Sequence, residues 1–333
     1  MAINQSKFKR IALVRLSALG DIVNSTIVLQ LIKKHYPDAQ IEWITEEAFA
    51  PLIENHPLLH KVHIVPLKRI KKEKNFKLLK QSISYLKKLG NFDNIIDMQG
   101  LIKSAVVARF IGKNIHGFDR HCTRESLASF FYTSTSAIAY EENIIHRNCG
   151  VVADALGFSI DDDEILNKKA LFNLQARPLS LHVKKNIAIV IGASWACKIY
   201  PKEQIVTLCT SSSEHFHLIW GNKTEYENAQ WIASRCDNVS VAPKLNLTQL
   251  INFIGHCELT IGNDTGPTHI AWAMNRASVT LFGPTNSRMI YETPINIALE
   301  SDTSVDLRHI DKNDFSISCI SPDVIAEKVK ELL

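Results

Sequence analysis

The sequence predicts an α/β protein made of two Rossmann-like, doubly wound domains that face each other across a cleft. Short apolar runs alternate with amphipathic segments from Ile11 to Phe118, which is typical of strands and helices in turn. A polar, irregular region at 161–185 interrupts the alternation, which then restarts. A length of 333 residues also exceeds what one hydrophobic core usually organises.

The first half contains five apolar runs that predict parallel strands. Between the first two runs a helix is expected over 21–35, because Ile22, Val23, Ile27 and Leu31 recur at helical spacing. The expected strands are 11–16, 41–45, 62–66, 94–97 and 114–118, and the other expected helices are 77–88 and 101–110.

The second half repeats the pattern, with strands expected at 187–191, 217–220, 239–241, 259–261 and 279–282. We therefore expect an N-terminal domain over 1–165 and a C-terminal domain over 166–320. The remaining segment, 321–333, has the pattern of an amphipathic helix and is expected to pack back on the first domain.

The composition is that of a soluble globular protein, with 46% hydrophobic and 22% charged residues. No run approaches the length of a membrane-spanning helix. The apolar segment 11–19 is interrupted by Arg15 and followed by Asp21, which disfavours a signal peptide and predicts a cytoplasmic location. Seven scattered cysteines without a Cys-x-x-Cys pair indicate reduced thiols.

Residues 258–274 predict a strand, a polar turn and an apolar helix in immediate succession. Gly266 and Pro267 suit the first helical turn, where free amides and the helix dipole favour a phosphate. Asp264 would repel that phosphate, so it is better explained as an acceptor for sugar hydroxyls attached to it. The alternative is that Asp264 only caps the helix or turn, which this segment alone favours.

A basic segment runs from Lys61 to Lys88, with ten Lys or Arg against the single acid Glu73. It predicts an acidic partner such as an anionic membrane lipid or glycolipid, and the alternative is a solvated helix face. Nucleic acid is disfavoured, because only Phe76 and Tyr85 are interleaved aromatics and no binding motif surrounds them.

The loops that follow the strands carry the candidate site residues, because ligands of such sheets bind at the carboxyl ends of strands. None of these loops is a G-x-G-x-x-G or a P-loop, which argues against a nicotinamide dehydrogenase, a nucleotide-sugar epimerase or an NTPase. The loops are 17–21, 99–104, 192–198 and 220–225.

Several motifs in these loops combine into one pattern over nearly the whole chain. They are L-S-A-L-G-D at 16–21, D-M-Q-G-L-I-K-S at 97–104, Lys198-x-x-Pro201, Trp220-Gly221 followed by Glu225, N-D-T-G-P-T-H at 263–269 and F-G-P-T at 282–285. The pattern resembles the lipopolysaccharide heptosyltransferases of glycosyltransferase family 9, which have the GT-B fold. The segment at 123–132, T-R-E-S-L-A-S-F-F-Y, resembles the members that add the first heptose to Kdo. The phosphate loop departs from the family, because Gly192-Ala193-Ser194-Trp195 stands where threonines are common.

This resemblance implies an ADP-heptose donor bound by the second domain. Lys198 would neutralise the leaving diphosphate, and Glu225 would accept both ribose hydroxyls. Backbone near Lys244 and Leu245 would meet the adenine, and Asp264 would lie against the heptose. His269 packs inside its helix or contacts the sugar, and Trp195 is a cleft wall or part of the core. The implied donor contacts are Ser194, Lys198, Glu225, Leu245, Asp264, Thr265, Gly266 and His269.

The resemblance also implies a Kdo-lipid A acceptor bound by the first domain. Inversion at the anomeric carbon needs one general base, and Asp21 matches the base by motif, while its alternative role is the N-cap of the next helix. Asp21 and Lys198 are thus the expected catalytic residues. The expected acceptor contacts, each of which is otherwise an ordinary surface cation, are Lys68, Arg69, Lys71, Lys72, Lys103, Arg120 and Arg124.

The main alternative is a heptosyltransferase II or another family 9 transferase with the same donor and a different acceptor. No cofactor or obligatory catalytic metal is expected, because no carboxylate–histidine cluster is present in the sequence. The implied partners are ADP-heptose, an inner-core glycolipid and the cytoplasmic face of the inner membrane, with peripheral association and no nucleic acid.

Overall fold

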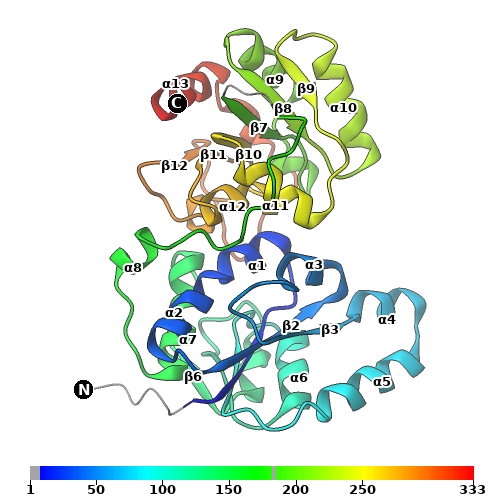
Figure 1. Ribbon diagram of the computed structural model, residues 1–333, viewed down its shortest axis with the longest axis vertical. Helices are drawn as coiled ribbons and strands as arrows, with labels where there is room; N and C mark the ends of the chain where they lie inside the picture. The colour runs from blue at the N-terminus through cyan, green and yellow to red at the C-terminus, as the bar shows by residue number, and fades with distance from the viewer. Residues whose placement is uncertain (1–7, 182–184) are drawn as a thin grey trace. The chain divides into compact units, whose positions relative to one another are not determined.

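Two six-stranded parallel sheets form the framework of the chain, one in each half (Figure 1). The structure, a computed structural model, describes residues 8–181 and 185–333. It divides into two units, Met1–Lys168 and Lys169–Leu333, so the boundary lies close to the one predicted after residue 165.

The first unit has its central strands buried on both faces, as a parallel sheet requires. The sheet order is β3-β2-β1-β4-β5-β6. The four residues from Ile11 to Val14 in β1 are all fully buried. Helices α1 and α2 pack against α7 on one face, and α5 packs against α6 on the other. The elements are β1 Arg10–Val14, α1 Leu19–Ser25, α2 Ile27–His35, β2 Gln40–Glu46, η1 Glu47–Phe49, α3 Ala50–Ile53, β3 Lys61–Val65, α4 Leu67–Glu73, α5 Phe76–Lys87, β4 Asn94–Asp97, α6 Ile102–Ile111, β5 Ile115–Phe118, η2 Ser126–Phe131, β6 Ser134–Ser136, α7 Ile144–Leu156 and α8 Asp162–Leu166.

The second unit repeats this topology. Its sheet order is β12-β11-β10-β7-β8-β9, which is the order of the first sheet when the strands are counted from β7. The elements are β7 Asn186–Val190, η3 Ala196–Lys198, α9 Lys202–Thr210, β8 His215–Ile219, α10 Lys223–Ala233, β9 Val239–Val241, α11 Leu247–Gly255, β10 Leu259–Asn263, α12 Gly266–Ala273, β11 Ala277–Phe282, η4 Ser287–Met289, β12 Asn296–Glu300, η5 Ser316–Cys319 and α13 Pro322–Leu332.

Each sheet contains one point where the direction of strand addition reverses. In the first sheet this point lies between β1 and β4, and in the second it lies between β7 and β10. The connections from the two strands there leave toward opposite faces of the sheet, so a crevice opens at their carboxyl ends. The loops after β1, β4, β7 and β10 are therefore placed to bind ligands.

The structure adds two strands that the sequence did not predict, and both lie at an edge of a sheet. They are β6 and β12, whose sequences S-T-S and N-I-A-L-E lack the continuous apolar run of the central strands. The helix expected over 21–35 is also divided into α1 and α2. The break is at Thr26, whose hydroxyl donates to the Val23 carbonyl at 2.7 Å.

Helix α13, which the sequence analysis expected to pack back on the first domain, belongs to the core of the second unit. Its contacts are with α9 and β11. Ile325 and Val329 are buried in the same cluster as Ile205, Leu208 and Val279. Its apolar face is thus used within the second unit.

Truncation of Ile325 tests this placement. Ile325 is fully buried, whereas its neighbour Val324 is 42% exposed. We expect Ile325→Ala to lower the free energy of unfolding by about 2–5 kcal/mol, because it leaves a cavity in the core. Val324→Ala should change it by less than about 0.5 kcal/mol. Urea denaturation of both variants checks this, and equal stabilities would show that α13 is not part of the core.

Candidate active site

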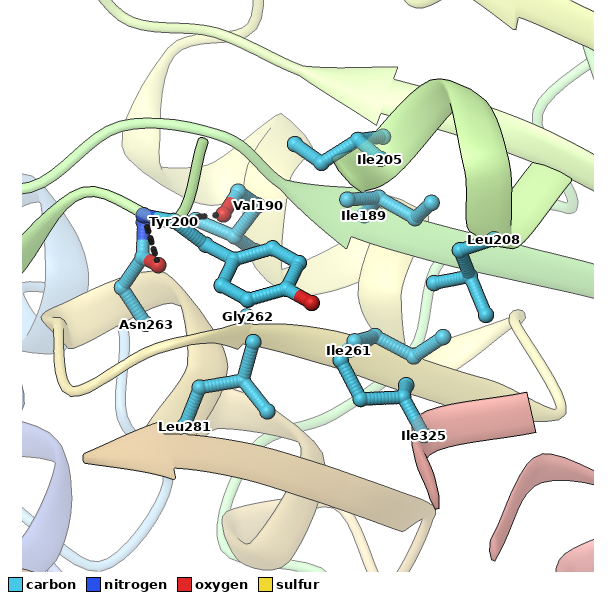
Figure 2. Close-up of a pocket in the computed structure, with 10 residues that line it drawn as sticks. All are labelled: Ile189, Val190, Tyr200, Ile205, Leu208, Ile261, Gly262, Asn263, Leu281 and Ile325. Atoms are coloured by element: carbon cyan, nitrogen blue, oxygen red, sulfur yellow. Dashed lines mark hydrogen bonds between the residues drawn. The ribbon is translucent and has the colours of Figure 1, made fainter. Parts of the chain in front are cut away.

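Asn263, at the end of β10, holds together the loops of the second crevice (Figure 2). Its side-chain oxygen accepts from the Tyr200 amide at 3.0 Å. Its side-chain nitrogen donates to the carbonyls of Val190 and Gly192 at 3.4 and 3.2 Å. The Tyr200 hydroxyl donates to the Ile320 carbonyl at 2.6 Å. The loop that carries Lys198 is therefore fixed beside the end of β10.

Asp264, the next residue, is a buried carboxylate surrounded by polar partners. It forms an ion pair with Lys198, lies 3.3 Å from Nε2 of His269 and accepts from the Thr285 hydroxyl at 2.8 Å. Burial opposes its ionisation, but the charge of Lys198 and the hydrogen bond with His269 hold the pKa of Asp264 well below its usual range. The carboxylate is thus charged and paired within the protein.

The alternative in which Asp264 caps the helix is wrong, because the N-cap of α12 is Thr265, whose side chain makes no capping hydrogen bond. Gly266 and Pro267 occupy its first turn, as the sequence predicts. His269 lies on the buried face of α12 and still contacts Asp264, so packing and a site contact coincide in it.

Glu225 is held over the loop that follows β7. Its two oxygens accept from the Gly221 amide and the Asn222 side-chain nitrogen, each at 2.6 Å. A Cβ atom on Gly192 would lie 2.3 Å from the Glu225 carboxylate, so only glycine permits this approach. Gly192 also accepts from Asn263, which connects Glu225 to the crevice that contains Asp264.

The remaining predicted donor residues surround these groups. Ser194 is exposed, and Leu245 is partly buried. The Trp195 ring centroid lies 5.5 Å from Nζ of Lys198 and 5.1 Å from Nζ of Lys312, so this side chain contacts cations and is not part of the core.

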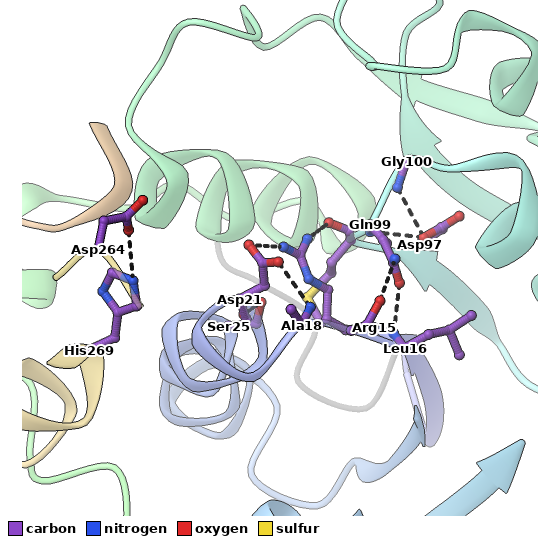
Figure 3. A network of polar contacts seen from close by, with 12 residues as sticks. Arg15, Leu16, Ala18, Asp21, Ser25, Asp97, Gln99, Gly100, Asp264 and His269 are labelled. Atoms are coloured by element: carbon purple, nitrogen blue, oxygen red, sulfur yellow. Dashed lines mark hydrogen bonds and ion pairs between the residues drawn. The ribbon is translucent and has the colours of Figure 1, made fainter. Parts of the chain in front are cut away.

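In the first unit, Asp21 is held at both carboxylate oxygens (Figure 3). One oxygen pairs with the Arg15 guanidinium at 2.8 Å, and the other accepts from the Ala18 amide at 3.0 Å. Asp21 is the third residue of α1, whose N-cap is Ala18, so the alternative role of Asp21 as the N-cap is wrong, although its carboxylate accepts from the amide of the N-cap residue. The side chain is 27% exposed and therefore accessible to a ligand.

Arg15 is a site residue that sequence reasoning missed. Its side chain is only 6% exposed, and it also donates to the Met98 carbonyl at the end of β4. Arg15 thus links the two strands that border the first crevice. The signal was present as a charge at the end of an apolar strand, where burial requires a partner.

Asp97 organises the second loop of this crevice and is fully buried. It accepts from the amides of Gln99 and Gly100 and from the hydroxyls of Ser104 and Tyr132. Burial raises the pKa of Asp97, and these hydrogen bonds oppose the rise.

Gln99 and Lys103, from the same loop, reach the loop that carries Asp21. Gln99 accepts from the Leu16 amide at 2.8 Å, and both Gln99 and Lys103 donate to the Ser17 hydroxyl, at 3.2 and 3.0 Å. Lys103 is thereby held beside the loop that carries Asp21.

The other predicted acceptor contacts are exposed and lie on separate elements. Lys68, Arg69, Lys71 and Lys72 are on α4, and Arg69 lies 3.3 Å from Glu47. Arg120 and Arg124 are in the segment after β5.

Glu46, at the end of β2, is a second site residue that sequence reasoning missed. Its carboxylate accepts from the Lys68 amide at 3.2 Å. Burial raises the pKa of Glu46, and Lys68 opposes that shift. The buried carboxylate therefore fixes the start of α4 beside the crevice.

Among residues 8–181 and 185–333, no group of three or more His, Cys, Asp or Glu is arranged to hold a metal ion. In the same residues no helix has the length and apolar character needed to cross a membrane. All seven cysteines of the sequence are free thiols in the structure.

Solved structures share this architecture. The heptosyltransferase WaaC of Escherichia coli, solved with ADP, superposes with a TM-score of 0.81 over 97% of this chain and 100% of that chain, at 24% identity. The fold is therefore that of a GT-B glycosyltransferase, as the sequence predicts.

Sequence comparisons lead to a particular family. The model of glycosyltransferase family 9 (heptosyltransferase) matches residues 83–320. The lipopolysaccharide heptosyltransferase 1 of Campylobacter coli is 38% identical and covers 97% of this chain and 98% of its own. The enzyme of the same name from Pseudomonas aeruginosa is 29% identical, with coverages of 83% and 79%. The chain belongs to glycosyltransferase family 9.

The pairing of Lys198 with Asp264 is testable through stability. Asp264→Asn should lower the free energy of unfolding by about 3 kcal/mol, because the buried ammonium loses its counter-charge. The double variant Asp264→Asn/Lys198→Met should recover most of that loss, because no charge is then left unpaired. Urea denaturation of the wild type, both single variants and the double variant measures the coupling. Additive effects would show that the two side chains do not interact.

Proposed function

We propose that this protein transfers L-glycero-D-manno-heptose from ADP-heptose to the Kdo of a lipopolysaccharide inner-core acceptor, with inversion at the anomeric carbon. The observation that carries the proposal is the 38% identity to a lipopolysaccharide heptosyltransferase 1 over 97% of the chain. The polar groups at the two crevices supply the chemistry that such a transfer needs.

The second unit is proposed to hold the donor. Lys198 offers a cation to the diphosphate, with Ser194 and the amides of Thr265 and Gly266 as further donors. Glu225 has two oxygens for the ribose hydroxyls, and backbone beside Leu245 lies after β9 for the adenine.

Asp264 gives this site its preference for a sugar. When Lys198 forms an ion pair with the diphosphate, the buried Asp264 carboxylate loses a hydrogen-bond donor. The hydroxyls of a heptose then donate to the carboxylate in its place. His269 and Thr285 keep the carboxylate in one orientation meanwhile.

The first unit is proposed to supply the base. The acceptor hydroxyl attacks the anomeric carbon, the bond from that carbon to the phosphate oxygen breaks, and the hydroxyl proton passes to Asp21. Arg15 and the Ala18 amide fix the carboxylate for this transfer. Lys198 stabilises the charge that develops on the departing ADP.

The acceptor is proposed to be Kdo-lipid A, reached by peripheral association with the cytoplasmic face of the inner membrane. Lys103 is oriented by Ser17 and suits the Kdo carboxylate, with Arg120 and Arg124 as further anion contacts. The exposed cations of α4, among them Lys68, Arg69, Lys71 and Lys72, suit the phosphates of lipid A.

Replacement of Asp21 tests the proposed reaction. Asp21→Asn keeps the size of the side chain and one oxygen acceptor, but it removes the proton acceptor. We expect turnover to fall by about two to four decades, while ADP affinity and the urea midpoint stay close to those of the wild type. Transfer from ADP-heptose to a panel of Kdo-bearing acceptors is followed by mass spectrometry. Near-normal turnover in a folded variant would exclude Asp21 as the base, and no transfer by the wild type to any acceptor would contradict the function.

The donor site is tested by moving Glu225 without removing it. Gly192→Ala should displace the Glu225 carboxylate by steric contact and weaken ADP binding by about 10- to 100-fold, as Glu225→Ala should. The matched control is Glu227→Ala, because Glu227 is an exposed acid on the same helix. Isothermal titration calorimetry with ADP measures all three variants. Unchanged affinity in both Gly192→Ala and Glu225→Ala would place the nucleotide elsewhere.

A further inference from the structure

The 3-10 helix η2 exposes two large apolar side chains on one face. Leu127 is 58% exposed and Phe130 is 76% exposed. Residues three apart lie above each other in a 3-10 helix, so these two side chains form a continuous apolar ridge. Exposed apolar groups that adjoin in this way are typical of contact surfaces.

The packing of the flanking residues holds the apolar ridge in this exposed position. Ala128, between the two exposed residues, is fully buried. Glu125 accepts from the Ile102 amide at the start of α6 at 2.7 Å, and Tyr132 donates to the buried Asp97 at 2.8 Å. The segment is therefore tied to α6 on one side and to the end of β4 on the other.

Cations border the apolar ridge. Arg120 and Arg124 are exposed in the segment that leads into η2. Lys103 is exposed near the start of α6, which packs against η2, and Ile102 beside it is 37% exposed. The region has two acids, and both already accept backbone amides: Glu125 from Ile102 of α6, and Asp119 from His121. Apolar groups beside cations are complementary to an anionic lipid surface.

We propose that the apolar ridge of Leu127 and Phe130 inserts into the interfacial layer of an anionic lipid bilayer, with Arg120 and Arg124 beside the lipid phosphates. The inference rests on the proposed function in one respect: a membrane glycolipid acceptor explains why the protein would contact a bilayer. The surface itself is argued from exposure, packing and charge.

A second copy of this chain is a poorer occupant of the same surface. A two-fold contact would bring each ridge against itself, because the two partners use the same patch. Arg120 and Arg124 of both copies would then lie close together, and their like charges would oppose the contact. An anionic bilayer offers both acyl chains for the apolar ridge and phosphates for the two arginines.

Vesicle binding by the full-length protein tests the inference. Wild type is sedimented with vesicles of phosphatidylcholine and phosphatidylglycerol at about 3:1, and with vesicles of phosphatidylcholine alone. We expect the double variant Leu127→Ser/Phe130→Ser to partition roughly tenfold or more weakly onto the anionic vesicles. The matched control is Phe315→Ser in the other unit, because Phe315 is 53% exposed and has the acids Asp311 and Asp314 near it in sequence. That control should bind within about twofold of the wild type.

Three results would overturn the inference. They are wild type that does not sediment with anionic vesicles, a double variant that binds as tightly as wild type, and light scattering that shows the double variant converting a wild-type dimer to a monomer. ADP titration and urea denaturation of the double variant confirm that it is folded. The vesicle assay measures binding and does not depend on heptose transfer. Wild type that binds vesicles but transfers no heptose to a soluble Kdo acceptor would therefore contradict the proposed function and leave this inference standing.

Discussion

The reversal of strand order in each parallel sheet is the constraint on which both sites depend. A sheet that grows in one direction keeps its connections side by side, and the space above its edge is filled. Where the direction reverses, at β1 and β4 and again at β7 and β10, the connections separate and leave polar loop residues facing a crevice. Asp21 and Lys103 come from the first reversal, and Lys198 and Asp264 come from the second. The same topology thus produces two sites in one chain.

Each crevice has a buried carboxylate at the same topological position, but the pKa values of the two carboxylates are shifted in opposite directions. Asp97 ends β4, and Asp264 directly follows β10, which is the fourth strand of the second unit. The partners of Asp97 are amides and hydroxyls, and burial raises its pKa. Asp264 is paired with an ammonium group, which holds its pKa low. Asp97 therefore stabilises the loop after β4 by hydrogen bonds, whereas Asp264 provides a negative charge with which a ligand can interact.

The central strands could be predicted from the sequence because both of their faces are buried, so their residues form unbroken apolar runs. The edge strands β6 and β12 were missed because their segments have no such run, whereas β3 and β9 at the opposite edges were predicted. The break at Thr26 was missed because it depends on one hydroxyl bonding to its own helix. The role of helix α13 in the core of the second unit could not be predicted, because an amphipathic pattern reveals an apolar face but not the residues that it packs against.

Among the candidate site residues, the sequence could name those that belong to a motif. Asp21 and Glu225 follow strands in short polar loops and could be named from the sequence. Arg15 could not, because its importance lies in a pairing with Asp21 and with the carbonyl of Met98, 83 residues away in the chain. Glu46 was missed for the same reason, since its partner is an amide on another connection. Residues that act through distant contacts leave no local signal.

The ion pair between Lys198 and Asp264 has a consequence for the order of events in a catalytic cycle. The ammonium group already has a counter-charge within the protein, so a phosphate must compete with an internal anion. On the proposed function, a donor that brings both phosphate and sugar satisfies both partners of the pair. On the same proposal, Asp264 would lose its hydroxyl donors once the sugar had moved to the acceptor, and it would then attract Lys198 again. Asp264 would then compete with the diphosphate of ADP for Lys198. This competition would weaken the binding of ADP but not that of the intact donor, so ADP would dissociate more readily than the donor.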